Sequence, residues 1–75
     1  MSHTLLFHLH NDDPILGEVS ELPGRNDQMI TISNPRRKDG KDLHYLESNV
    51  VTIILPVVRI TFIEIIPSSM EEEII

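Results

Sequence analysis

The chain has 75 residues, contains no cysteine, and carries a formal net charge of −6 from 12 acidic and 6 basic residues. That length suits one small domain, the missing cysteines exclude a disulfide scaffold and a thiolate metal site, and the acidic balance disfavours a generally basic nucleic-acid binder. Twenty of the 75 residues are Ile, Val or Thr and none is Ala, which favours pleated strands over helices.

The N-terminal third of the chain predicts a hairpin of two strands. Residues 4–10 alternate between apolar positions on one face and more polar positions on the other, and residues 11–14 (NDDP) form a turn by composition. A second strand is predicted over residues 15–22. Gly17 stands in it where a side chain would otherwise pack, so we expect another part of the chain to approach the backbone closely there.

The middle of the chain predicts a third strand and a second hairpin. Residues 29–34 alternate as a strand, after a loop at residues 23–27. The polar segment 35–42 carries Asp39-Gly40 at its tip, which is a strong hairpin-turn signal. Residues 43–47 are therefore expected to form the returning arm of that hairpin.

The C-terminal part predicts two further strands, at residues 50–55 and 59–66, which Pro56 separates because it lacks a backbone N–H. We therefore expect one all-β domain over residues 1–67 and an acidic tail over residues 68–75. For the tail, a frayed end and a single helical turn both remain open. Five short antiparallel strands in so small a chain should curl into an open barrel.

Both faces of the last two predicted strands are apolar, as in strands that are covered on both sides. In the last strand, Ile60, Phe62 and Ile66 are expected on one face, with Ile63 and Ile65 on the other. One face can line the core, and the other needs cover that a small domain cannot supply by itself. We therefore expect a partner copy, either in a head-to-tail ring or in a two-fold dimer.

No targeting or membrane-spanning segment is predicted. The N-terminus lacks a basic region before its short apolar stretch. Residues 50–66 are too few to cross a bilayer and contain Pro56, Arg59 and Glu64. We expect a cytoplasmic protein that has no membrane partner.

The order of these elements resembles the Sm-like superfamily (Sm, LSm and Hfq proteins), and the resemblance covers residues 4–67. Residues 15–19 (ILGEV) resemble its apolar-x-Gly-x-apolar segment, and residues 27–32 (DQMITI) resemble the Asp-x-x-Met run that opens its third strand. Residues 50–67 resemble its second motif. Residues 33–36 (SNPR) look most like the small Sm-like proteins of tailed, cyanophage-like viruses.

The resemblance implies a strongly bent five-stranded antiparallel sheet that forms a small open barrel and assembles into a ring. In the family, strand four of one subunit pairs with strand five of the next. The residues expected at that intersubunit contact are Val50, Ile54, Ile63 and Ile65. The sequence leaves open whether the ring has five, six or seven subunits. If a phage encodes the protein, its compartment is the host cytoplasm.

The resemblance also implies a ring that binds single-stranded RNA at its pore or rim, as an RNA chaperone or an RNA-processing accessory. Carried over by position, the RNA-binding residues are Arg25, Asn26, Asp27 and Met29 from the loop before the third strand, together with Arg59 from the connection between the last two strands.

The basic cluster Arg36, Arg37, Lys38 and Lys41 has two interpretations. One is a phosphate contact on the outer rim of the ring. The other is a solvated hairpin tip, because Asp39 and Asp42 reduce the charge of the cluster to +2.

The alternative function is a structural or protein-interaction ring that binds no nucleic acid. Ile30 stands where the family has its base-binding asparagine, and the loop before it lacks an aromatic residue for base stacking. The negative charge also opposes attraction of phosphates. Half of that charge, however, lies in Glu71–Glu73, and without this run the net charge falls from −6 to −3.

No metal, no cofactor and no enzymatic activity is predicted. His8 and His10 form a His-x-His pair, but the spacing supplies no third ligand for a metal site. The chain contains no glycine-rich phosphate loop, nucleophile elbow or His-Glu-x-x-His motif. Glu64 lies on an apolar strand, and we expect it to pair with an arginine such as Arg59 rather than to act as an acid.

Overall fold

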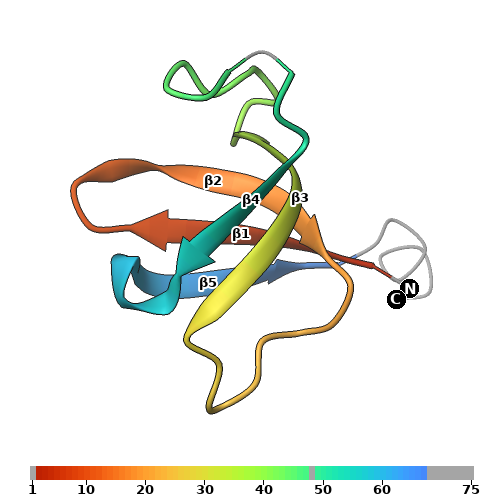
Figure 1. Cartoon of the computed structure of the whole chain (residues 1–75), viewed down its shortest axis with the longest axis vertical. Coiled ribbons are helices and arrows are strands. Elements are labelled where there is room, and N and C mark those ends of the chain that lie inside the picture. The colour runs from red at the N-terminus through yellow and green to blue at the C-terminus, as the bar shows by residue number, and fades with distance from the viewer. Residues whose placement is uncertain (1, 48, 68–75) are drawn as a thin grey trace.

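The computed structural model describes residues 2–47 and 49–67, which form one five-stranded antiparallel sheet in the order β4-β3-β2-β1-β5 (Figure 1). The elements are β1 (His3–Leu9), β2 (Asp12–Val19), β3 (Met29–Arg37), β4 (Thr52–Pro56), the 3₁₀ turn η1 (Val57–Arg59) and β5 (Ile60–Ile66). The sheet does not close, because its two outer strands, β4 and β5, are not paired with each other. The all-β prediction is confirmed; the tail at residues 68–75 lies outside the described residues.

The turn between β1 and β2 is tighter than the sequence predicted. Leu9 pairs with Asp12, so only two residues connect the strands, and Asn11 adopts a left-handed φ of 62°. Asn tolerates this conformation because its short polar side chain can bond to the local backbone. The expected turn at residues 11–14 is therefore corrected, since the second strand already begins at Asp12.

The close approach expected at Gly17 is confirmed. A Cβ at this position would overlap the Cγ2 methyl of Ile32 and would lie 3.1 Å from the carbonyl oxygen of Ser33. The pairing of β2 with β3 shifts register between Leu16 and Glu18, around this glycine. Such an irregularity bends a strand and increases its twist. Because Gly17 has no side chain, the fully buried Ile32 side chain can occupy the space beside its backbone.

The hairpin predicted after the third strand is only half correct. The strand runs on to Arg37, and a turn follows in which Gly40 has a φ of 89° and the N–H of Arg37 donates to the carbonyl of Lys41. Residues 43–47 contain no strand, so the returning arm is wrong. Leu43 instead packs into the core with 4% of its surface exposed, and burial of this side chain takes precedence over continued strand pairing.

The last two strands follow the prediction closely, with one change of face. Pro56 ends β4 opposite Met29, and the 3₁₀ turn then leads into β5. The pairing of β5 with β1 shifts register between Ile60 and Phe62, which inserts Thr61 as an extra residue. This bulge turns Ile60 toward the core, so the expectation that Ile60 shares a face with Phe62 is wrong.

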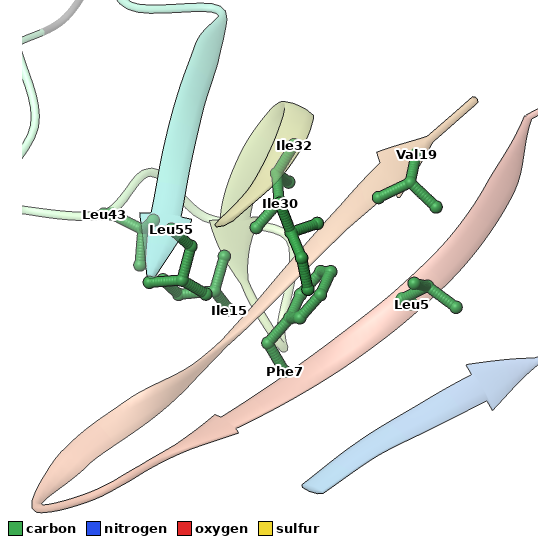
Figure 2. Packing of buried hydrophobic residues seen from close by; sticks show 8 residues of the cluster. All are labelled: Leu5, Phe7, Ile15, Val19, Ile30, Ile32, Leu43 and Leu55. Carbon is green, nitrogen blue, oxygen red and sulfur yellow. The ribbon is translucent and has the colours of Figure 1, made fainter. Parts of the chain in front are cut away.

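The core receives side chains from both edge strands. Figure 2 shows its buried members, among which Leu55 comes from the edge strand β4. Its buried members are Leu5, Phe7, Ile15, Val19, Ile30, Ile32, Leu43 and Leu55, and its partly buried members include Ile53, Ile60 and Ile63. Because β4 and β5 pack against one cluster, the sheet curves around it. No helix within residues 2–47 and 49–67 is long and apolar enough to span a membrane.

Candidate assembly edges and nucleic-acid interface

Exposed apolar side chains lie along both edge strands. Ile54 of β4 is 63% exposed, and Ile65 and Phe62 of β5 are 62% and 57% exposed. Each of these strands is paired on one side only, so its outer N–H and C=O groups can receive another strand. Val51, just before β4, and Val58, in the turn between the edges, extend this apolar surface.

The four predicted intersubunit residues do not share one environment. Ile54 and Ile65 are exposed on the edge strands, where a neighbouring strand could cover them. Val50 lies before the first residue of β4 and is only 36% exposed. Ile63 packs against the core, so within a single subunit it already has partners.

The predicted RNA-binding residues of the loop between β2 and β3 lie at its exposed tip. The carboxylate of Asp27 accepts a hydrogen bond of 2.7 Å from the N–H of Gly24, and the N–H of Asp27 donates to the Gly24 carbonyl at 3.2 Å. Asp27 therefore shapes the loop. Arg25 and Asn26 are exposed within that turn, and among the described residues Arg25 forms no ion pair.

The loop between β2 and β3 is joined to the turn between β4 and β5. The N–H of Val57 donates to the carbonyl of Gln28 at 2.9 Å, next to the pairing of Met29 with Pro56. Met29 is well exposed and so is Val58. The structure thus places Met29 beside the turn between β4 and β5, which contains Arg59, the other part of the predicted RNA site.

Arg59, the remaining predicted RNA contact, is bound to the turn between β1 and β2. Its guanidinium Nη2 lies 3.4 Å from the Asp12 carboxylate, and its carbonyl accepts a hydrogen bond from the N–H of His10 at 3.3 Å. A carboxylate beside the guanidinium competes with a phosphate for the same donors. The Arg59 guanidinium would have to break its ion pair with Asp12 before all of its N–H donors could bind an RNA phosphate.

The two arginines of the basic cluster, Arg36 and Arg37, are paired with carboxylates. Arg36 donates to both oxygens of Glu18 at 3.0 and 2.8 Å and to the carbonyl of Asn34 at 2.8 Å. The bidentate hydrogen bond from Arg36 holds the pKa of the Glu18 carboxyl below its ordinary value, against a partial burial that raises it. This pair was not anticipated, because only the register of β2 against β3 brings the two side chains together.

The rest of the basic cluster lies at the tip of the turn after β3. Arg37 lies 3.6 Å from the Asp39 carboxylate, which also accepts a bond of 3.0 Å from the backbone N–H of Lys41. Lys38 and Lys41 are exposed. A shallow hollow beside Arg37 and Lys38 is lined in addition by Asp13 and Pro14. The two lysines are the cations of this cluster that remain available to a phosphate.

The expected pairing of Glu64 with Arg59 is wrong. The Glu64 carboxylate lies 2.6 Å from Nε2 of His8, across the pairing of β1 with β5, and the His8 ring stacks on Phe62. The sequence contained no local signal for this contact, since the residues are 56 positions apart. Within residues 2–47 and 49–67, no three His, Cys, Asp or Glu side chains are grouped so that they could hold a metal ion.

Comparison of the chain with protein-family models, with curated proteins and with solved structures gave no match.

Proposed function

We propose that this chain is a ring-forming Sm-like protein that binds single-stranded RNA at the pore or rim of the ring, in the cytoplasm. The observation that carries the proposal is the strand order, which places β4 and β5 at opposite edges of the sheet with exposed apolar side chains on both. Two different edges that fit each other make a head-to-tail contact, and repetition of that contact closes a ring when the rotation allows it.

Burial at these edges supplies the driving force for assembly. Covering a large aliphatic or aromatic side chain completely contributes roughly 1.5–3 kcal/mol, and Ile54, Phe62 and Ile65 are each more than half exposed in the single subunit. Pairing of β4 with β5 of a neighbour would also satisfy the outer N–H and C=O groups of both strands. A two-fold dimer through one edge would leave the other edge uncovered.

The RNA-binding part of the proposal is supported by the exposed tip of the loop between β2 and β3. Arg25 and Asn26 offer a charge and a base-reading amide, and Met29 offers an apolar surface beside the β4–β5 turn. A ring repeats this set once per subunit, so weak contacts to successive nucleotides add as one multivalent interaction. The outer-rim alternative uses Lys38 and Lys41.

Assembly is tested by native mass spectrometry of the wild type and of single lysine variants. Ile54→Lys and Ile65→Lys place a charge on opposite edges, and each should convert the discrete oligomer to monomer while the chain stays folded by circular dichroism. Ser20→Lys adds the same charge at an exposed position directly after the central strand β2 and should leave the oligomer intact. A wild type that is monomeric at tens of micromolar contradicts the assembly proposal.

RNA binding is tested by fluorescence anisotropy with oligo(U) and oligo(A) at low and moderate salt. We expect binding at micromolar ring, weakened severalfold by Arg25→Ala. Lys38→Ala removes the same charge from the turn after β3, and a larger loss there would assign binding to the outer rim instead. If no RNA binds to an intact ring, or if both variants bind as the wild type does, the RNA proposal fails.

A second candidate function is a structural or protein-interaction ring. It is favoured by the carboxylates of Glu18, Asp39 and Asp12, which pair with Arg36, Arg37 and Arg59 respectively. In this case the native mass is a whole multiple of the chain mass at every salt concentration. A ring that copurifies with stoichiometric RNA rules this function out.

A further inference from the structure

A histidine, a carboxylate and an aromatic ring form a compact cluster on the outer face of the sheet. His8 Nε2 lies 2.6 Å from the Glu64 carboxylate, and the rings of His8 and Phe62 stack with centroids 4.1 Å apart and planes 15° apart. The hydroxyl of Thr61 donates to the His8 carbonyl at 3.0 Å. The side chain of His8 is 25% exposed and that of Glu64 is 50% exposed, so water still reaches the carboxylate.

This cluster lies beside the free edge of β5. Phe62 and Glu64 project from the outer face of β5, opposite the core-facing Ile63. A strand added along that edge places its own outward side chains next to them, because directly opposed residues on one face lie about 5 Å apart. On β4 the exposed outer side chains include Thr52 and Ile54. Assembly by this pairing would therefore reduce the access of water to the Glu64 carboxylate.

We infer that protonation of His8 couples ring assembly to pH, so that the ring is tighter near pH 6 than near pH 8. This inference rests on the proposed assembly of β4 with β5. A carboxylate that loses water needs a charged or hydrogen-bonding partner, and in the described structure His8 is the side chain bonded to Glu64. Both forms of an imidazole can donate a hydrogen bond to a carboxylate, but only the imidazolium adds the attraction between opposite charges. Histidine is the side-chain type whose charge ordinarily changes between pH 5 and 8.

Other charged groups near His8 do not reproduce this effect. From β2, Asp13 and Pro14 lie opposite His8, between the Leu9–Asp12 and Phe7–Ile15 pairs. Asp12 is bound to Arg59, which comes from the turn before β5. Ordinary carboxylates and guanidinium groups keep their charge throughout pH 6 to 8. Their field therefore does not change across this range.

The test measures the concentration at which the oligomer dissociates, by native mass spectrometry and light scattering in a dilution series at pH 6 and pH 8. For the wild type we expect dissociation at a concentration about tenfold higher at pH 8 for each interface, equivalent to ~1.4 kcal/mol. His8→Gln and Glu64→Gln should lose this difference, because the first removes the imidazole that changes charge and the second removes the carboxylate that pairs with it. His10→Gln is the matched control and should keep it, since His10 lies in the exposed turn.

The outcomes separate this inference from the proposed assembly. A discrete ring whose dissociation is the same at both pH values overturns the pH coupling and leaves the assembly standing. A pH difference that persists in both His8→Gln and Glu64→Gln assigns it to the overall negative charge and also overturns the coupling. A monomer at every pH overturns both proposals together.

Discussion

Replacement of Gly17 by alanine should destabilise the fold more than the same change at either of the other glycines. The added Cβ would overlap the Cγ2 methyl of Ile32 and would also lie 3.1 Å from the Ser33 carbonyl oxygen. Ile32 is fully buried, so its methyl group has no free space to enter. The other obstacle is backbone, which cannot move without disturbing the pairing of β2 with β3.

Overpacking of a well-packed core costs typically 1–3 kcal/mol. A domain of 75 residues has a total stability of about 4–11 kcal/mol at 0.05–0.15 kcal/mol per residue. Urea unfolding followed by circular dichroism should therefore show a midpoint lower by about 1–3 M, for an m-value near 1 kcal/mol/M. All variants are compared at one protein concentration, because assembly makes apparent stability concentration-dependent.

The other two glycines are built-in controls for Gly17→Ala. At Gly24 the nearest atom to a new Cβ is an Asp27 carboxylate oxygen at 3.6 Å, an ordinary contact, so the cost should stay within about 0.5 kcal/mol. At Gly40 nothing lies within 4 Å but φ is 89°, so the cost should be about 1 kcal/mol from conformation alone. In an Ile32→Ala background, Gly17→Ala should cost less than it does alone. Equal midpoints for Gly17→Ala and Gly24→Ala would refute the packing argument.

Three further predictions concern single side chains. Glu18→Gln should lower the free energy of unfolding at pH 7 by up to about 1 kcal/mol. Because Arg36 lowers the pKa of Glu18 in the folded state, this difference is present above the ordinary pKa of 4.5 and disappears as the pH falls through the folded-state pKa. Urea unfolding of both proteins between acid and neutral pH checks this. Burial raises the pKa of the Tyr45 hydroxyl, and the negative charges of Asp12 and Asp13 raise it further. In Asp12→Asn, the pKa of this single tyrosine, followed by ultraviolet absorbance, should move toward its ordinary value. An unchanged titration curve would exclude the Asp12 contribution. Leu43→Ala should cost about 2–5 kcal/mol in chemical unfolding, and a smaller loss would show that Leu43 is not part of the core.

The strand pattern was predictable because side-chain alternation is a local property of the chain. Leu5 and Phe7 enter the core from β1, as their spacing predicts, although Leu6 between them is buried as well. Gly17 marks the close approach of Ile32. The errors occur where a local signal competes with burial. Asp39-Gly40 does form a turn, but Leu43 then leaves the strand to enter the core.

The candidate site was less predictable, because ion pairs depend on register. The expected RNA contacts Arg25, in the loop before β3, and Met29, the first residue of β3, are both exposed, whereas Arg59 is paired with Asp12. The spacing of residues in the sequence cannot predict this ion pair, because Arg59 and Asp12 are 47 positions apart in the chain. The carboxylate partners of the arginines therefore became visible only in the folded sheet.

An all-β domain with a surplus of apolar residues in its last two strands could be predicted from the sequence, because composition and alternation are local properties of the chain. The positions of those apolar residues in space follow from the fold. The strand order places β4 and β5 at the two edges of the sheet, and the bulge at Thr61 turns Ile60 inward while Phe62 stays outside. The fold also decides which predicted RNA contacts are neutralised, since carboxylates lie within ion-pair distance of Arg36, Arg37 and Arg59.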